Sequence, residues 1–391
     1  MSLRNRIGLE LFRAYRHNNA RLHPLRSLFW ECTLRCNMHC RHCGSDCKVS
    51  STVPDMPAED FLRAVDRLAP HVDPHTTFII FTGGEPLLRD DIADVGLELY
   101  RREFPWGMVT NGLLLDEQRL DQLQRAGIHS VSVSLDGLAD DHNWVRRHPD
   151  SFAGAERAIR LLAGSDDVLW DVVTCVNPRN YGSLPQLRDR LVELGVRRWR
   201  IFTIFPMGRA AHDPELQLTD AQFRGTLDFI KQFRNNSQLS TFPPCNNSQL
   251  STVQQLNNST SPSCNNSQFS TLNSQLQVSY ACEGFLGDYE RQVRNQFFYC
   301  RAGVEVMSVL CNGDISGCTS IRSNFSQGNI YRDDIWEVWQ QRFQKLRDRS
   351  WTRKGECAHC KVYRYCEGSG LHLYDDNEQL LCCHYNRIQN R

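Results

Sequence analysis

The sequence of 391 residues has no excess of charge of either sign, because 45 Lys and Arg residues balance 45 Asp and Glu residues. A protein without net charge offers no general attraction for phosphates, so we expect no nucleic acid among its partners. No apolar run approaches the length of about 18 residues that a membrane-spanning helix needs. The Arg-rich opening also lacks the apolar core of a signal peptide. We therefore expect a cytoplasmic protein with no membrane partner.

Cysteine, by contrast, is abundant, with 17 residues in the chain. The cytosol keeps thiols reduced, so disulfides explain that number poorly. Metal ligation or redox chemistry is the favoured interpretation. The length predicts two or more domains, with enough chain to bury a core.

A regular alternation of β-rich runs and amphipathic helical segments extends from about residue 27 to 210. The predicted strands are 27–32, 77–82, 106–110, 130–135, 168–176 and 198–205. The predicted helices between them are 58–69, 91–103, 116–126, 152–163 and 183–194. Six strand–helix units predict an α/β fold with a partial (β/α)6 TIM-like barrel, in which functional groups follow the carboxyl ends of the strands.

A low-complexity insert is predicted over 235–280, where NNSQLST recurs and no charged residue occurs. Polar repeats of this kind bury too little apolar area to offset chain entropy, so we expect disorder there. Beyond it we expect a polar helix at 283–297, a hairpin at 303–318 that turns at Asn312-Gly313, and a helix at 335–349. The predicted division is a basic amphipathic helix in 1–25, a barrel in 26–234, the insert, and a small Cys-rich α+β domain in 281–391.

Three cysteines follow directly on the first predicted strand. Cys36, Cys40 and Cys43 form C-x3-C-x2-C on a loop at its carboxyl end. Three thiolates on one [4Fe–4S] cluster leave an iron open to a small molecule, whereas four would close the site. The motif resembles the signature of the radical S-adenosylmethionine (SAM) superfamily, whose open iron chelates SAM. The resemblance implies reductive cleavage of SAM to a 5′-deoxyadenosyl radical that abstracts hydrogen from a substrate.

Further positions at the strand ends are similar to those that bind SAM in this superfamily. A Gly-Gly-Glu-Pro segment follows the second strand, and its two glycines would let the main chain approach the SAM amino group. Ser134 and Arg146 resemble positions that bind the SAM carboxylate, and Asn177 one that contacts the ribose. His42 stands where an aromatic ring near the adenine is common. The resemblance thus implies these cofactor-binding residues: His42, Gly83, Gly84, Glu85, Pro86, Ser134, Arg146 and Asn177.

A second group of cysteines occupies the C-terminal part. Spacing alone favours a structural zinc ribbon, but the pattern resembles the SPASM extension of radical SAM enzymes, which carries auxiliary [4Fe–4S] clusters. The resemblance implies these metal ligands: Cys300, Cys318, Cys357, Cys360, Cys366 and Cys382, with Cys383 as the alternative to the last. The family expects a cysteine where this chain has Gly370, so one or two auxiliary clusters remain possible. Cys311 or Cys282 could replace the missing ligand.

The resemblance also bears on the substrate. SPASM-bearing radical SAM proteins are largely maturases of ribosomally made peptides or proteins. The resemblance therefore implies a peptide or protein substrate and an electron donor such as flavodoxin or ferredoxin. Sulfatase maturases carry an Asp where this sequence has Thr319, so we expect a different maturase. The alternatives are a formylglycine-generating enzyme of the sulfatase-maturase type and a non-catalytic, metal-stabilised interaction protein. No catalytic acid or base can be assigned from the sequence.

Overall fold

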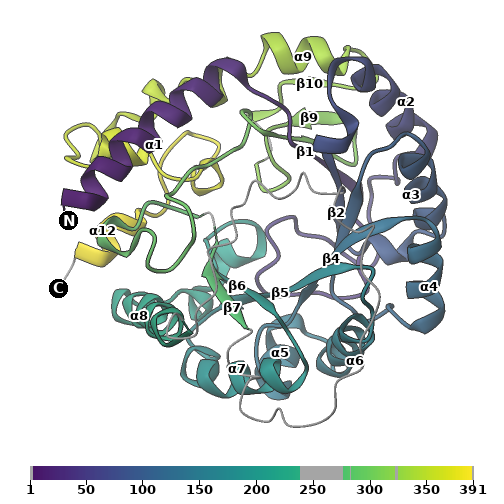
Figure 1. Cartoon of the computed structure of the whole chain (residues 1–391), viewed down its shortest axis with the longest axis horizontal. Helices are drawn as coiled ribbons and strands as arrows, with labels where there is room; N and C mark the ends of the chain where they lie inside the picture. Colours follow the sequence, from purple (N-terminus) through teal and green to yellow (C-terminus); the bar gives the residue numbers. More distant parts are fainter. Residues whose placement is uncertain (1–2, 238–275, 282, 322–324, 390–391) are drawn as a thin grey trace, which may run out of the picture.

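The computed structural model describes residues 3–237, 276–281, 283–321 and 325–389, and its centre is one curved sheet (Figure 1). The sheet order is β10-β9-β8-β1-β2-β3-β4-β5-β6-β7. The strands are β1 (Ser27–Thr33), β2 (Phe78–Gly83), β3 (Trp106–Thr110), β4 (Ile128–Ser134), β5 (Leu169–Val176), β6 (Arg198–Thr203), β7 (Gln277–Tyr280), β8 (Val306–Val309), β9 (Asp314–Ser316) and β10 (Gly328–Asn329). The pairs from β8 through β1 to β7 are all parallel. The predicted α/β partial barrel is confirmed.

Helices on the outer side of the sheet connect its successive parallel strands (Figure 1). These are α2 (Ala58–Leu68), α3 (Ile92–Arg101), α4 (Glu117–Arg125), α6 (Ser151–Ala163), α7 (Leu184–Glu193) and α8 (Asp220–Ser237). The five helices predicted between the strands are present. Two helices of the barrel were missed. The short and mostly polar sequence of α5 (Ala139–Arg146) has little apolar periodicity, and α8 was not predicted and ends inside the range assigned to the insert.

A set of buried aromatic rings fixes how the helices lie against the sheet. The Trp30 ring of β1 stacks on Phe61 of α2, with centroids 4.3 Å apart, and meets Phe81 of β2 edge-on. Trp106 of β3 is fully buried and packs against α3 at Gly96, where a Cβ atom would come within 2.2 Å of the ring. The small residue lets this helix approach the sheet closely.

The amino-terminal helix α1 (Leu3–Leu22) docks on the C-terminal part of the same chain. Leu9 is buried, and Arg16 donates to the carbonyl oxygen of Tyr365 at 2.6 Å. Asn19 donates to the buried carboxylate of Glu305. One face of α1 is therefore part of the fold.

The C-terminal part is built from short elements. Strands β8 and β9 form the predicted hairpin, with Gly313 in the left-handed region at a φ of +86°. The helix expected at 335–349 is divided into α9 (Ile335–Gln341) and α10 (Gln344–Arg347). Arg347 donates to the carbonyl oxygens of Gln340 and Trp339 near the end of α9, so those acceptors are satisfied without further helical turns. Two more short helices follow, α11 (Tyr363–Cys366) and α12 (His384–Gln389).

The helix expected at 283–297 is wrong, because that segment holds only a short 3-10 turn, Gly287–Tyr289. Its chain wraps around the buried carboxylate of Glu290 instead. That carboxylate accepts hydrogen bonds from the backbone N–H groups of Leu286 at 2.9 Å and Phe298 at 2.8 Å. A polar helix would have left Glu290 without these partners.

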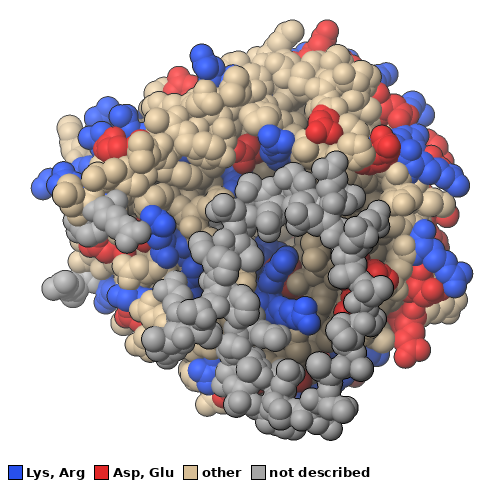
Figure 2. Space-filling model, viewed as in Figure 1, with Lys and Arg blue, Asp and Glu red and all other residues tan. Residues whose placement is uncertain are grey.

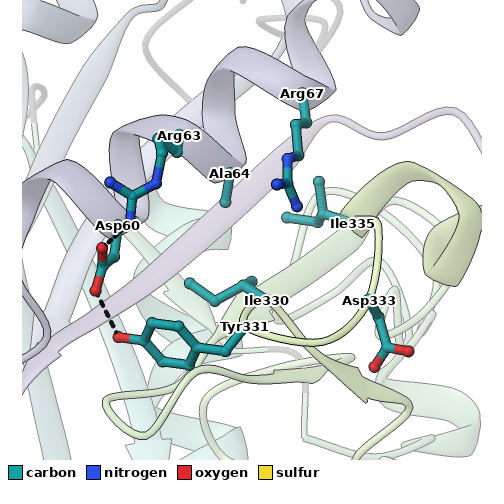
Figure 3. Close-up of a pocket in the computed structure, with 8 residues that line it drawn as sticks. All are labelled: Asp60, Arg63, Ala64, Arg67, Ile330, Tyr331, Asp333 and Ile335. Carbon is teal, nitrogen blue, oxygen red and sulfur yellow. Dashed lines mark hydrogen bonds and ion pairs between the residues drawn. The ribbon is translucent and has the colours of Figure 1, made fainter.

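The barrel and the C-terminal part meet at a groove beside α2 (Figure 3). Tyr331 donates its phenolic hydrogen to Asp60 of α2 at 2.9 Å, and Ile335 lies across from Arg67. The groove shares no lining residue with either thiol-lined cavity described below. We interpret this groove as part of the packing interface between the barrel and the C-terminal part.

Much of the predicted insert lies outside the described residues. The structure describes α8 up to Ser237 and resumes before β7, which falls within the range assigned to the insert. Predictions for 238–275, including those for Cys245 and Cys264, stay untested. On the face drawn in Figure 2, basic and acidic side chains are interspersed. Within the described part of the chain, no helix is both long and apolar enough to cross a membrane.

Replacing Gly96 by Ala tests the packing of α3 on β3. Alanine favours a helix by about 1 kcal/mol over glycine, but its Cβ would meet Trp106 at 2.2 Å. We expect overpacking to prevail and to lower the free energy of unfolding by about 1–3 kcal/mol, measured in urea. Gly182→Ala is the control, because no atom lies within 4 Å of its added Cβ. A Gly96→Ala protein as stable as the parent would contradict this packing.

Candidate active site

The loop after β1 brings three thiols to one cavity. Cys36, Cys40 and Cys43 line a space of about 630 Å³ at the carboxyl ends of β1 to β4. The backbone N–H of Cys36 donates to the carbonyl oxygen of Lys48 at 2.8 Å, and Arg209 donates to that of Cys40 at 2.7 Å. The loop is thus held at both its start and its middle. All fourteen cysteines among the described residues are free thiols.

The glycine turn after β2 packs directly on the beginning of this loop. The N–H of Gly84 donates to Thr33 O at 2.7 Å, and that of Glu85 donates to Arg35 O at 2.9 Å. A Cβ on Gly84 would lie 1.9 Å from Arg35 O, and one on Gly83 would lie 2.2 Å from Thr33 O. Only glycine fits at either position. The N–H groups of Gly84 and Glu85 are used within the fold. A ligand amino group, as a donor, would need the carbonyl oxygens of the turn as its acceptors.

Glu85 does not line the cavity itself but forms hydrogen bonds to two residues that do. Its carboxylate is fully buried and accepts from Thr110 Oγ1 and Asn111 N, both at 2.8 Å, and from Leu87 N at 3.2 Å. Burial raises the pKa of Glu85, although these hydrogen bonds oppose the rise. Thr110 and Asn111 line the cavity, whereas Glu85 and Pro86 do not. The turn therefore ties the ends of β2 and β3 together.

A buried ion pair lies beside the second thiol. Arg146 Nε donates to Asp136 Oδ2 at 2.7 Å, and Arg146 Nη1 lies 3.8 Å from Cys40 Sγ. Burial alone would raise the pKa of Asp136, but Arg146, with His42 and His142, outweighs it and lowers that pKa to about 2. Asp136 was missed by the sequence prediction, although it follows Ser134 by two residues at the end of β4. Its position after a strand was the available signal.

His42 lines the cavity as a neutral ring. Burial lowers the pKa of His42 to about 4, and its Nδ1 atom is buried without a hydrogen-bond partner among the described residues. His42, Asp136 and Cys175 offer ligand atoms within 4.8 Å of one another. We do not interpret these three as a cation site, because Arg146 already supplies the positive charge that pairs with Asp136.

The other predicted SAM contacts differ in position. Ser134 and Arg146 line the cavity. Asn177 does not, and its side-chain oxygen accepts from the backbone N–H groups of Arg179 and Asn180. Its contact with the ribose stays a prediction. Arg209, which lines the cavity and also donates to Cys47 O, was missed.

The thiols of the first cavity suit a bound metal cluster. Burial raises the pKa of the Cys36 thiol to about 12. A hydrogen bond from Cys47 lowers the pKa of Cys43. Ligation would supply the positive charge that makes all three thiolates favourable. Three convergent thiols, a neutral ring with an unpaired nitrogen and a side-chain-free turn fit a three-thiolate cluster with a small ligand.

A second cavity, of about 350 Å³, is lined by four thiols of the C-terminal part. These are Cys357, Cys360, Cys366 and Cys383. Cys382, which stood first in the sequence prediction, does not line the cavity, and its thiol hydrogen-bonds with Arg387. Four thiols complete a closed [4Fe–4S] or zinc site, and the structure favours Cys383 as the fourth.

The remaining cysteines form no comparable set within the described residues. Cys300 lies against Arg349, which outweighs the effect of burial and lowers the pKa of the thiol. Cys311 donates to Pro54 O at 3.4 Å, near β1. Cys318 is partly exposed, and Cys282 lies outside the described residues. The space beside Gly370 is filled by the ring of His372, 2.5 Å from where a Cβ would stand.

Comparison with protein families gives two matches. Residues 30–191 match the radical SAM superfamily, and residues 300–361 match SPASM, an iron–sulfur cluster-binding domain. The first match includes the loop with Cys36, Cys40 and Cys43. The second includes Cys357 and Cys360 of the four thiols that line the second cavity.

Sequence relatives differ in how much of the chain they share. An "AdoMet-dependent heme synthase" of Methanosarcina barkeri is 24% identical over 359 residues, covering 89% of this chain and 92% of the relative. A "PqqA peptide cyclase" of Granulibacter bethesdensis is 27% identical over 189 residues, covering 47% of this chain and 48% of the relative.

Solved structures share the fold at low identity. "Native anSMEcpe with bound AdoMet and Cp18Cys peptide" has a TM-score of 0.67 at 18% identity, covering 94% of each chain. "Streptococcus suis SuiB bound to precursor peptide SuiA" has a TM-score of 0.62 at 15% identity, covering 92% of this chain and 75% of that one. These likenesses confirm the fold.

Two neighbouring substitutions separate the fourth ligand of the second cavity from its alternative. Cys383→Ala should lose about four irons per chain after anaerobic reconstitution, because a [4Fe–4S] site would lack a thiolate. Cys382→Ala should keep them, since its thiol lies outside the cavity. Iron and zinc are measured together by elemental analysis. Loss of iron from Cys382→Ala alone would contradict the assignment, and zinc in place of iron would restore the zinc-ribbon interpretation.

Proposed function

Because this chain carries a radical SAM domain followed by a SPASM domain, we propose that it is a radical SAM maturase that modifies a peptide or protein. The observation that supports this most is the convergence of Cys36, Cys40 and Cys43 on one cavity with the glycine turn after β2. The two domains imply [4Fe–4S] clusters. When bound, the first cluster and SAM would supply the one-electron cleavage that begins radical chemistry.

Each residue around the first cavity has a proposed role. Cys36, Cys40 and Cys43 hold the cluster, and the carbonyl oxygens of the glycine turn receive the SAM amino group. Ser134 and Arg146 receive the SAM carboxylate, and Asp136 positions the guanidinium of Arg146 for it. The neutral ring of His42 lies against the adenine. Because Cys36 and Cys40 are each only 8% exposed, the fold shields these two thiols from bulk water.

The charges in the cavity favour a substrate whose reacting group is uncharged. Both arginines that line it have partners in this proposal, Arg146 with Asp136 and the SAM carboxylate, and Arg209 with Asp46 at 2.9 Å. A polycarboxylate substrate would need further basic groups at this position. A peptide backbone or side chain needs none, and two structural neighbours are described with bound peptides.

A tetrapyrrole is the second candidate substrate, because the heme synthases match over nearly the whole chain. A formylglycine-generating reaction, the alternative named from the sequence, is less favoured because Thr319 has no carboxylate to serve as its base. A one-electron donor such as flavodoxin or ferredoxin belongs to the proposal in each case.

Reductive cleavage of SAM tests the activity without knowledge of the substrate. Anaerobically reconstituted protein with dithionite and SAM should release 5′-deoxyadenosine, measured by chromatography and mass spectrometry. Cys40→Ala should lower the rate by at least about 100-fold, because the cluster loses a ligand. Cys382→Ala, which removes a thiol outside both cavities, is the control. No release by the parent protein would favour a non-catalytic, metal-stabilised protein.

The substrate class is tested by offering the candidate substrates to the protein one at a time. Small precursor peptides encoded beside this gene, iron-coproporphyrin III and a sulfatase peptide are each incubated with active protein and SAM. We expect a mass change in a precursor peptide and none in the other two. Decarboxylation of the porphyrin would replace the peptide proposal with the tetrapyrrole one. Oxidation of the sulfatase peptide would establish the formylglycine alternative.

A further inference from the structure

The outer face of α1 carries a row of apolar side chains that are exposed to solvent. Leu3, Ile7, Leu11, Tyr15 and Leu22, together called the α1 stripe, are between 52% and 73% exposed. Ten large hydrophobic residues are exposed within the described part of the chain, so half of them lie on this one helix. Single exposed apolar residues are normal, whereas a continuous row indicates a binding surface.

The opposite face of α1 is packed into the fold, so the α1 stripe is ordered before any partner binds. Leu9 and Arg16 on that face are each 3% exposed. The stripe residues from Leu3 to Tyr15 are four positions apart, which places them on one side of the helix. A helix of 20 residues is about 30 Å long. Because α1 runs along the outer edge of the molecule (Figure 1), the α1 stripe forms a straight ridge there.

The charges beside the α1 stripe are basic. Arg6, Arg13 and Arg21 recur at helical spacing along one flank of it. Glu10 is the only acidic residue of α1, and it is already paired. Its carboxylate lies 3.2 Å from Arg13 Nε and 2.6 Å from Arg364 Nη2. The flank therefore presents positive charge to a partner.

A shallow hollow of about 580 Å³ adjoins the middle of the α1 stripe. It is lined by Arg6, Ile7, Glu10, Leu11, Arg364 and Tyr365. The Tyr365 hydroxyl donates to Glu10 at 2.7 Å and so helps to satisfy the one carboxylate in the hollow. Two apolar side chains beside two guanidinium groups suit an amphiphile with an anionic head.

Three kinds of partner could cover such a ridge, and the charge and shape of α1 distinguish them. A second copy of this chain would present the same basic flank and would offer no complementary charge. A peptide or protein would have to supply a groove as long as the ridge. A bilayer with anionic lipids needs no groove, because apolar side chains enter between its lipids while arginines meet the phosphates.

We propose that α1 docks this protein on an anionic lipid surface, with the α1 stripe at the boundary between headgroups and acyl chains. Arg6 and Arg364 meet lipid phosphates there. The expectation of no membrane partner was based on the lack of a spanning run and of a signal peptide, but a helix that lies in the plane of the bilayer needs neither. Docking requires neither a cluster nor SAM, so it is independent of the proposed function.

Vesicle flotation with full-length, anaerobically reconstituted protein tests the docking. The vesicles are made of phosphatidylcholine alone, or of equal parts of phosphatidylcholine and phosphatidylglycerol. Bound and free protein are measured after centrifugation. We expect binding to the anionic vesicles that weakens as salt is added, because salt screens the attraction between arginine and phosphate. Binding to phosphatidylcholine alone should be much weaker.

The apolar contribution is tested by replacing two stripe residues. Ile7→Ser combined with Leu11→Ser should lower the partition coefficient for anionic vesicles by at least about 10-fold, because two side chains no longer gain from leaving water. Val49→Ser combined with Leu169→Ser is the matched control, since both residues are exposed and lie outside α1. The control pair should bind as the parent does.

The electrostatic contribution is tested by replacing two arginines on the flank. Arg6→Gln combined with Arg21→Gln should weaken binding to anionic vesicles by about 10-fold and reduce its salt dependence. Arg101→Gln combined with Arg125→Gln is the matched control, because these side chains are 64% and 79% exposed on α3 and α4. All of these positions are on the surface, so the variants should keep the unfolding temperature of the parent.

A parent protein that does not bind anionic vesicles would overturn the inference, as would equal binding to phosphatidylcholine alone. Binding that survives Ile7→Ser with Leu11→Ser, or that is lost equally in the control pairs, would overturn it as well, because another surface would then be responsible. If the parent ignores vesicles but forms a dimer that the two stripe substitutions dissociate, the α1 stripe belongs to a second copy. If those substitutions instead abolish binding of a precursor peptide, it belongs to a peptide.

Discussion

The close approach of the glycine turn after β2 to the chain after β1 is the constraint on which the active site depends. Gly83 and Gly84 lie so near the carbonyl oxygens of Thr33 and Arg35 that no side chain fits between them. The resulting hydrogen bonds fix where the loop with three thiols begins. Glu85 then ties the same turn to the end of β3. A chain that lost this contact would keep its cysteines but would no longer bring them to one cavity.

Buried charge is the second requirement of the site. Asp136 is fully buried, and its carboxylate is stable there because Arg146 Nε and the backbone N–H of Cys175 donate to it. The same pair holds a guanidinium beside Cys40, where a thiolate is needed. Burying an unpaired charge is costly, so Asp136 and Arg146 depend on each other. The sheet supplies this geometry, since Asp136 follows β4 at the edge where β1 and β2 also end.

Sequence patterns predicted the parts of the molecule that are periodic or carry a motif. Six strands, the helices between them and the thiol loop were found because their signals are local. Strands β7 and β10 were missed because each has at most four residues and is defined by its neighbours in the sheet. The choice between Cys382 and Cys383 could not be made from spacing, since adjacent residues point in different directions and only the fold decides which faces the cavity. Arg209 was missed for the same reason.

The central claim is that SAM binds to an open iron of a cluster held by Cys36, Cys40 and Cys43. Electron–nuclear double resonance of the reduced, anaerobically reconstituted protein, with SAM labelled with ¹⁵N at its amino group, tests this claim most directly. The account predicts a hyperfine coupling between the labelled nitrogen and the reduced cluster, which disappears in Cys40→Ala. A reduced cluster in the parent protein with no coupling to the labelled nitrogen would contradict it.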